Sequence, residues 1–144
     1  ISVPNGGRAG VTQLPTQVDT NHYYSYREIN NLAKPNIGWS SYYQAMGELS
    51  YPETAKNQKI QCSLIIGFKI DEKGEVVSVT IESFQEDGKW GKCADCETLI
   101  IDFFKNIQWI PGHLHHKNVK TINYEEVQFT IYDPDSKEVF SPFH

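Results

Sequence analysis

Apolar and polar residues alternate over two neighbouring stretches in the middle of the chain. The first stretch has apolar side chains on one side at Cys62, Leu64, Ile66, Phe68 and Ile70. The second, from about Val76 to Phe84, places Val77, Val79 and Ile81 on its inward side. Lys73-Gly74 lies between them, and glycine adopts a positive φ without a Cβ penalty. A period of two residues therefore predicts an antiparallel β-hairpin.

Two further stretches have the spacing of amphipathic helices. Residues Trp39, Tyr42, Tyr43 and Met46 follow the i, i+3, i+4, i+7 pattern, which predicts a helix over about 39–48. The second set comprises Cys96, Leu99, Ile100, Phe103, Phe104 and Ile107. We expect this second helix to cover one face of the hairpin, because each element needs a partner for its apolar side.

The alternation returns in a last strand over about 119–132. Val127, Phe129 and Ile131 fall on one face, and the opposite face carries Tyr124, Glu126, Gln128 and Thr130. Together the elements predict an α+β fold, in which a small antiparallel sheet of about three strands is packed on one face by helices. The chain order is β-hairpin, helix, β-strand.

The ends of the chain lack this periodicity. Residues 1–35 are rich in glycine, proline and polar residues, which is typical of a linker or a docking arm. Within it, 21–33 has the composition of a short helix or strand. The folded domain is expected over 36–134, and Asp133-Pro134 is expected to end it, leaving 135–144 as an irregular tail.

Length and charge limit the classes of function. The 144 residues suit one domain, and 13 Lys plus Arg against 18 Asp plus Glu give a net charge of −5. Nucleic acid is excluded as a partner, because phosphate binding needs clustered cations. No apolar run reaches the length of a membrane span. Because the chain begins at Ile1 instead of methionine, we interpret it as a processed or truncated product.

Acidic pairs occur along the chain but carry no catalytic pattern. The pairs are Asp71-Glu72, Glu86-Asp87 and Glu125-Glu126, and each falls in a predicted turn or on a strand with a solvent side. We interpret them as solvated charges. The sequence has no Ser-His-Asp order, phosphate-binding glycine loop or H-E-x-x-H, so we expect no enzyme activity and no cofactor.

Several of these elements, in this order, resemble the C-terminal domain of the TonB energy transducers, in the form common among Bacteroidetes-type sequences. The resemblance runs from about Trp39 to Tyr132. Its pieces are Tyr51-Pro52-Glu53-Thr54-Ala55, the stretch from Phe68 to Val76, Trp109-Ile110-Pro111-Gly112, and Lys117-Asn118-Val119 before the last strand.

The resemblance implies a periplasmic domain at the end of a membrane-anchored protein. Such a domain binds the TonB-box peptide of a TonB-dependent outer-membrane receptor as an added strand, and passes on force from an inner-membrane motor. Carried onto this chain, the partner-binding residues are Tyr51, Pro52, Tyr124, Glu126, Gln128 and Thr130. The alternative is a self-standing exported or lipoprotein binding module of the same fold. A homodimer also stays open.

The cysteines and histidines depart from the family pattern. Cys93 and Cys96 form a C-x-x-C, which invites a thiol-disulfide interpretation, but the βαβ context of such enzymes is missing. A zinc site would combine them with His113 and His115, followed by His116. In an oxidising periplasm a disulfide is the more economical alternative, joining Cys62 to Cys93 or Cys96, or Cys93 to Cys96. Three small buried hydrophobic residues are the remaining alternative.

Overall fold

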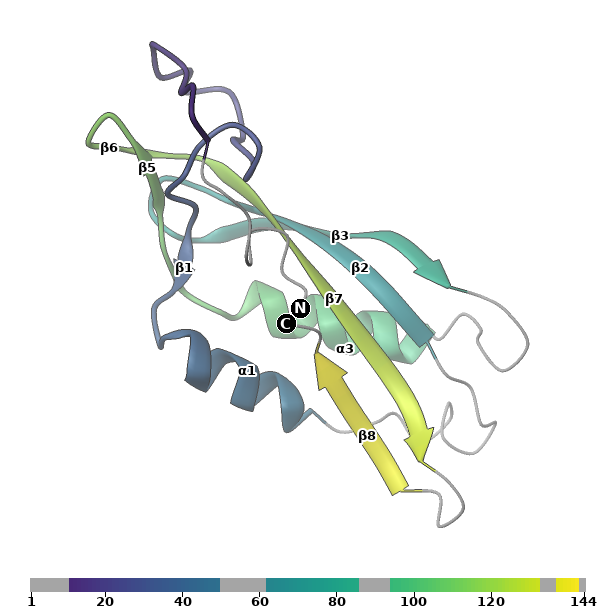
Figure 1. Ribbon diagram of the computed structural model, residues 1–144. Coiled ribbons are helices and arrows are strands. Elements are labelled where there is room, and N and C mark those ends of the chain that lie inside the picture. Colours follow the sequence, from purple (N-terminus) through teal and green to yellow (C-terminus); the bar gives the residue numbers. More distant parts are fainter. Residues whose placement is uncertain (1–10, 50–61, 86–93, 133–136, 143–144) are drawn as a thin grey trace.

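A four-stranded antiparallel sheet forms the centre of the molecule. The computed structural model describes residues 11–49, 62–85, 94–132 and 137–142 (Figure 1). The strands are β2 (Cys62–Ile70), β3 (Val76–Gln85), β7 (Thr121–Tyr132) and β8 (Lys137–Pro142), in the order β3-β2-β7-β8. Two helices, α1 (Trp39–Gly47) and α3 (Ala94–Lys105), pack on one face of it. The predicted α+β architecture is confirmed.

The sheet has one strand more than predicted. β8 pairs with β7 in antiparallel register, from Val127 opposite Pro142 to Tyr132 opposite Lys137. The expectation of an irregular tail over 135–144 is therefore wrong for residues 137–142. The sequence Asp133-Pro134 is typical of the end of a strand. A further strand, β8, nevertheless follows it and pairs with β7.

The hairpin of β2 and β3 is built around a glycine turn, as predicted. Gly74 has a φ of 86°, and the carboxylate of Asp71 accepts hydrogen bonds from the main-chain N–H groups of Lys73 and Glu75, both at 2.9 Å. The N–H of Trp109 donates to the carbonyl of Gly74 at 2.9 Å. The turn is thus held from inside by an aspartate and from outside by the segment that follows α3.

The core lies between the sheet and the two helices. Leu64, Ile66, Phe68 and Ile70 are buried, as the alternation predicted. From α3, Cys96, Ile100 and Phe104 are buried against them, and the rings of Phe68 and Phe104 stack with centroids 4.7 Å apart.

One inward position on β3 was predicted incorrectly. Val77 is 50% exposed, and Val76 packs against the core in its place. The reason is a register shift between Lys69 and Ile70, which brings Val76 opposite Ile70. A one-residue slip moves a side chain to the other face of the sheet, and the shift has that effect at the start of β3.

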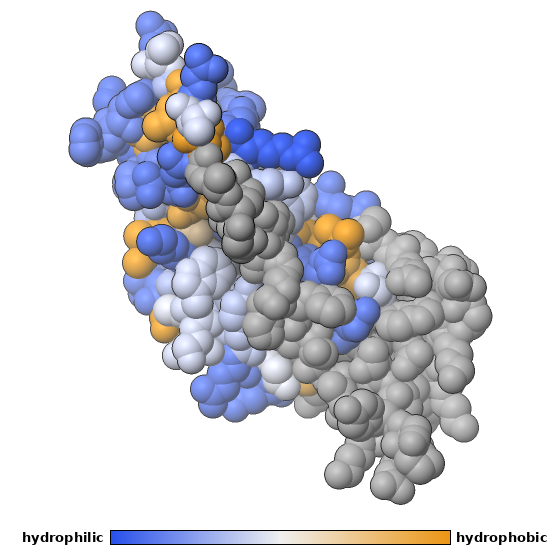
Figure 2. All heavy atoms as spheres, viewed as in Figure 1, coloured by the Kyte–Doolittle hydropathy of each residue, from blue (hydrophilic) through white to orange (hydrophobic). Residues whose placement is uncertain are grey.

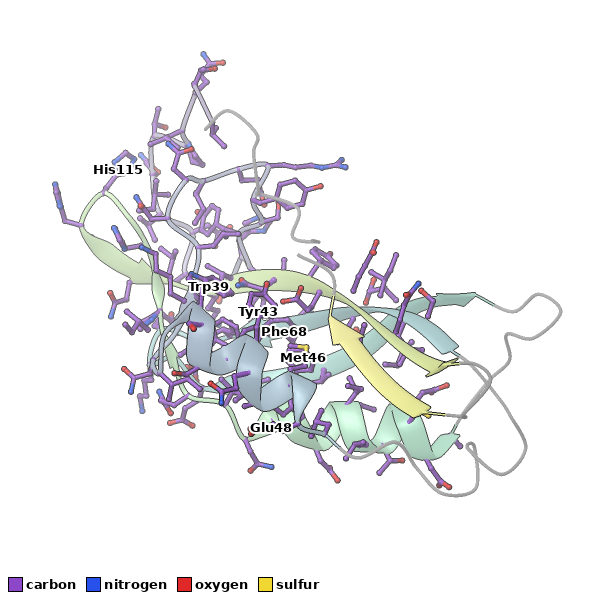
Figure 3. The ribbon with its side chains drawn as sticks, turned by 60° about the horizontal axis from the view of Figure 1, so that its bottom comes forward. Trp39, Tyr43, Met46, Glu48, Phe68 and His115 are labelled. Carbon is purple, nitrogen blue, oxygen red and sulfur yellow. The ribbon has the colours of Figure 1, made fainter. Side chains whose placement is uncertain are left out.

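The aromatic residues of α1 meet the sheet unequally. Tyr42 and Met46 are fully buried, while Trp39 at the start of the helix is 40% exposed. Figure 3 shows Tyr43 and Met46 on α1, with Phe68 of the sheet behind them. Trp39 is therefore only partly in the core, although its ring lies 6.1 Å from that of the buried Trp109.

Residues 11–35 form an arm that packs on the end of the sheet (Figure 1). Its last strand, β1 (Lys34–Pro35), pairs with β4 (Trp109–Ile110). A short hairpin of β5 (Gly112–Leu114) and β6 (Lys117–Val119) adjoins it. Together the arm and this hairpin bury a second apolar cluster formed by Tyr24, Ile29, Leu114 and Val119. In Figure 2 the surface of this region is mostly hydrophilic, with small separate apolar areas.

Candidate partner-binding site

β7 carries four of the predicted partner-binding residues. Tyr124, Glu126 and Gln128 are partly exposed and alternate with the buried Asn123, Glu125 and Val127. Thr130 follows in the same strand. The strand thus brings the four residues into one row, while Tyr51 and Pro52 lie outside the described residues.

The sequence analysis predicted β7 as the last strand of the fold, but β7 is an interior strand of the sheet. β2 pairs with it along Thr121 to Phe129, and β8 pairs with its other side from Val127 onward. Gln128 lies opposite Ser141 and Thr130 opposite Val139. The side of β7 that faces away from β2 is therefore already paired with β8 from Val127 to Tyr132.

The arm pairs with the beginning of β7 on this same side. The N–H of Tyr24 donates to the carbonyl of Lys120, and the N–H of Ile122 donates to the carbonyl of Tyr24, both at 2.9 Å. Beyond Tyr24 the arm turns away, closed by a hydrogen bond from the N–H of Glu28 to the carbonyl of Ser25 at 3.0 Å.

A short length of β7 remains between the arm and β8, and we call residues 123–126 the open stretch. Main-chain groups of alternate residues in a strand point to opposite sides. Because Ile122 bonds to the arm, those of Tyr124 and Glu126 point to the same side, away from β2. Within the part of the chain that the structure describes, no strand pairs with them there. With respect to the described strands, the open stretch thus presents donors and acceptors that a further strand can pair with.

A cavity of about 410 Å³ adjoins the open stretch. Its walls come from the arm, from β2 and from β7: Ser25, Tyr26, Arg27, Ile65, Tyr124, Glu125 and Glu126. Its volume falls within the range of ligand-binding sites, which are concave and have a few polar groups among apolar ones.

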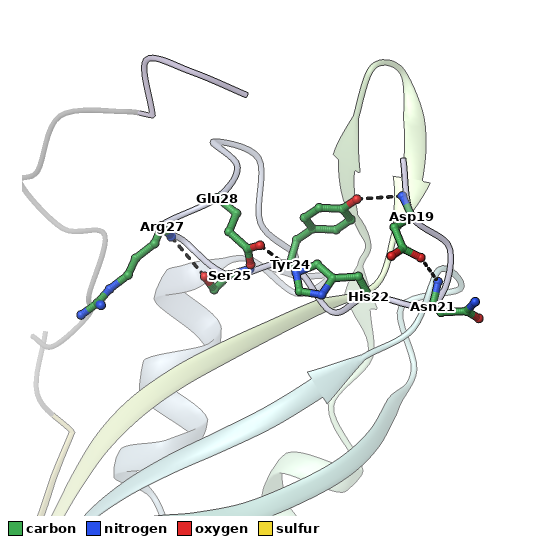
Figure 4. A network of polar contacts seen from close by, with 7 residues as sticks. All are labelled: Asp19, Asn21, His22, Tyr24, Ser25, Arg27 and Glu28. Carbon is green, nitrogen blue, oxygen red and sulfur yellow. Dashed lines mark hydrogen bonds and ion pairs between the residues drawn. The ribbon is translucent and has the colours of Figure 1, made fainter. Parts of the chain in front are cut away.

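Polar contacts within the arm fix the wall of this cavity (Figure 4). The side chain of Glu28 accepts a hydrogen bond from the N–H of Ser25 at 3.0 Å and contacts His22 Nε2 at 2.7 Å. The N–H of Asp19 donates to the hydroxyl of Tyr24 at 2.8 Å. The turn that carries Ser25 to Arg27 is therefore held by its own side chains.

Glu125 is a buried carboxyl that the sequence analysis interpreted as solvated, and this interpretation is wrong. Only 3% of the residue is exposed, and the hydroxyls of Tyr42 and Tyr43 on α1 both donate to its Oε2 at 3.1 Å. Burial raises the pKa of Glu125 to about 7, although the two hydroxyls act to lower it. The available signal was its parity with Val127, which places it on the inward face.

The cysteines and histidines lie apart in the described structure. Cys96 is buried and disulfide-bonded, and the side chains of Cys62 and Cys93 lie outside the described residues. A cysteine in a disulfide is not a thiolate ligand, so the zinc alternative is not supported at Cys96. His115 Nε2 hydrogen-bonds to the carbonyl of Pro15 at 2.6 Å. Among the described residues, no three metal-binding side chains are grouped to hold an ion.

The fold defines the class as a small α+β domain, consistent with a TonB C-terminal-like fold. Residues 47–94 match the family described as the Gram-negative bacterial TonB protein C-terminal, and the match includes β2, β3 and the turn between them. This match, over about a third of the chain, supports the resemblance to the TonB C-terminal domain found in the sequence. No curated protein matches the chain. None of the described helices is long and apolar enough to cross a membrane.

Proposed function

We propose that this domain binds an extended segment of a TonB-dependent outer-membrane receptor as an added strand and transmits energy for transport through it. The match of residues 47–94 to the TonB C-terminal family supports a periplasmic interaction role, with outer-membrane receptors as the general class of partner. Anchoring to a membrane through a segment outside this chain, and coupling to an inner-membrane motor, belong to the same proposal.

The observation that carries the proposal is the open stretch of β7. Tyr124 and Glu126 turn their main-chain groups toward the cavity side, where a guest strand can pair with them. At about 3.3 Å per residue, four residues span roughly 13 Å, so a guest of about four residues fits without rearrangement. A longer guest must displace Tyr24 of the arm or the end of β8.

Titration with receptor peptides tests the proposal. Peptides from the N-terminal segments of outer-membrane receptors of the same organism are added to the ¹⁵N-labelled domain while amide shifts are recorded. We expect shifts at Tyr124, Glu126 and the arm residues beside them. Shifts confined to β3, whose outer side is unpaired among the described strands, would move the binding site to that edge.

N-methylated peptides supply the control for strand pairing. Alternate residues of a strand point their N–H groups to opposite sides, so methylation in one alternate set should abolish binding and in the other should leave it unchanged. Equal effects of the two sets would argue against pairing with β7. The absence of any shift at millimolar peptide would contradict the proposed function itself.

A further inference from the structure

Two lysine side chains meet at one tyrosine ring of the arm, close to the beginning of β7. The ammonium nitrogen of Lys69 on β2 lies 5.0 Å from the ring centre of Tyr23, and that of Lys120 lies 5.4 Å from the same centre. Both distances are typical of cation–π contacts, which help to hold the arm on the sheet. We call these three residues the dilysine patch.

The positive charge of the dilysine patch is not neutralised within the part of the chain that the structure describes. Neither ammonium group forms an ion pair or a hydrogen bond with a described residue. Two like charges beside one ring repel each other, and the contact with the ring does not use their N–H groups as hydrogen-bond donors. An anion relieves the repulsion and accepts these hydrogen bonds. Because the whole chain has a net charge of −5, the dilysine patch is a local exception that attracts acidic groups.

The dilysine patch lies on the face of the sheet opposite the helices. On β2, Lys69 alternates with Phe68 and Ile70, which belong to the core, and Figure 1 shows both helices on the core side. Lys69 is opposite Ile122 of β7, two residues before Tyr124 in the open stretch. Two residues of a strand span roughly 7 Å. The dilysine patch therefore adjoins the open stretch.

We propose that the dilysine patch binds an acidic stretch of the receptor segment, directly beside the residues that pair with β7. The inference rests on the proposed function, because it assigns the flank of the guest strand. Tyr24 of the arm closes the edge of β7 through its bonds to Lys120 and Ile122. A guest that stays on the sheet leaves the edge at that point, and the helices leave the face with the dilysine patch uncovered. A flank of two or three residues spans roughly 7–10 Å, which is enough to reach it.

The size of the effect follows from the exposure of the two lysines. Lys69, Lys120 and Tyr23 are half-buried, and ion pairs that water reaches contribute little individually and weaken with salt. We expect two such pairs to strengthen binding about threefold to tenfold at low ionic strength. The gain should disappear in about 1 M sodium chloride, where the Debye length is about 3 Å.

Blocked peptides with an acidic tail at one end or the other test the inference. The core probe is Ac-Thr-Val-Thr-Val-NH₂, and Gly-Glu-Glu is added after it, or Glu-Glu-Gly before it. Matched peptides carry glutamine in place of glutamate, and amide shifts of the ¹⁵N-labelled domain give each Kd. We expect one of the two glutamate peptides to bind more tightly than its glutamine partner, with shifts at Tyr23, Lys69 and Lys120. A gain from the C-terminal tail indicates a guest antiparallel to β7, and a gain from the N-terminal tail indicates a parallel one.

Three variants assign the gain to the two lysines. The double variant Lys69→Gln, Lys120→Gln should lose the gain while the core peptide binds as before, which also shows that the domain is folded. The double variant Lys69→Arg, Lys120→Arg keeps both charges and should keep the gain. Lys117→Gln is the matched control, because Lys117 is an exposed lysine on β6 outside the dilysine patch. The gain should persist in this variant.

The outcomes separate this inference from the proposed function. Equal affinities for the glutamate and glutamine tails at both ends, or a gain that survives the double glutamine variant, overturn the inference and leave the proposed function standing. Shifts at the dilysine patch with phosphatidylglycerol vesicles but not with glutamate tails overturn it in favour of a lipid surface. If only the receptor peptides bind, the same tails attached to them decide the question. Failure of every peptide, the receptor peptides included, overturns both proposals.

Discussion

The hydroxyl of Tyr42 donates a hydrogen bond of 3.1 Å to Glu125, joining the first helix to the interior of β7 across 83 residues of sequence. Both residues are buried. The contact fixes α1 directly beneath the part of β7 where the open stretch lies. Any change of charge or geometry at Glu125 is therefore felt by the helix and by the candidate site together.

Removing the hydroxyl of Tyr42 should destabilise the domain in a pH-dependent way. In Tyr42→Phe the carboxylate loses one of its two tyrosine donors, and hydrogen bonds to charged groups contribute about 1.5–3 kcal/mol. We expect that loss in the free energy of unfolding at pH 8 and a smaller one at pH 5, where Glu125 is protonated. Urea denaturation at the two pH values measures it. Tyr23→Phe, outside this contact, should change stability by less than about 0.5 kcal/mol.

The buried carboxyl of Glu125 should also shape the stability of the whole domain against pH. Its pKa rises from an ordinary 4.5 to about 7 in the folded state, chiefly through burial. A raised pKa gives a contribution that is complete below pH 4.5 and is lost as the pH rises through 7. The shift corresponds to about 3 kcal/mol.

Glu125→Gln isolates this contribution, because the amide is similar in shape and does not titrate. The variant should match the wild type near pH 4.5 and exceed its free energy of unfolding by up to about 3 kcal/mol at pH 8. Denaturation curves from pH 4 to pH 9 provide the measurement. Parallel pH profiles for the two proteins would show that Glu125 is not the responsible group.

Glu125 also illustrates where sequence reasoning stopped. The alternation of β7 was predicted correctly, so the inward position of residue 125 was available from its neighbour Val127. A charged residue in a pair with Glu126 was nevertheless interpreted as solvated, because the two hydroxyls that accommodate it come from a helix distant in sequence. Hydrophobic periodicity and residue propensity describe one helix or strand at a time. The burial of Glu125 depends on the contact between two elements, α1 and β7.

The strand that follows β7 was missed for a related reason. The hairpin of β2 and β3 and the core positions of α3 follow from local patterns, and they were predicted. β8 lies beyond Asp133-Pro134, which ends a strand locally, yet its pairing with β7 is a tertiary event. The arm contact at Tyr24 likewise depends on packing with the β5–β6 hairpin. The open stretch exists because the pairing of the arm ends before residue 123 and that of β8 begins only at Val127. The sequence of one segment alone does not predict this.

The disulfide of Cys96 is expected to join α3 to β2. Alternation places Cys62 on the same side as the buried Leu64, and the beginnings of β2 and α3 lie at the same end of the sheet (Figure 1). We predict a Cys62–Cys96 bond and one free thiol at Cys93. Chain-entropy estimates for a loop of this size give about 3–4 kcal/mol of stabilisation.

Peptide mapping without reduction, combined with a thiol titration, checks this pairing. A cross-linked pair of peptides that contain Cys62 and Cys96 is the expected product. The double variant Cys62→Ser, Cys96→Ser should have a free energy of unfolding about 3–4 kcal/mol lower than that of the wild type. A bond between Cys93 and Cys96, or three titratable thiols, would contradict the pairing.

Two glycine substitutions test the contact between the β2–β3 turn and the segment after α3. We expect them to change the free energy of unfolding differently. Gly74 has a positive φ of 86°, and a Cβ there would collide with the carbonyl oxygen of Trp109. Gly47, at the end of α1, has no atom within 4 Å of an added Cβ. Gly74→Ala should cost more than about 1 kcal/mol, whereas Gly47→Ala should be neutral or gain up to about 1 kcal/mol. Thermal and urea denaturation of the two variants measures both, and equal effects would mean that the contact between Gly74 and Trp109 does not constrain the turn.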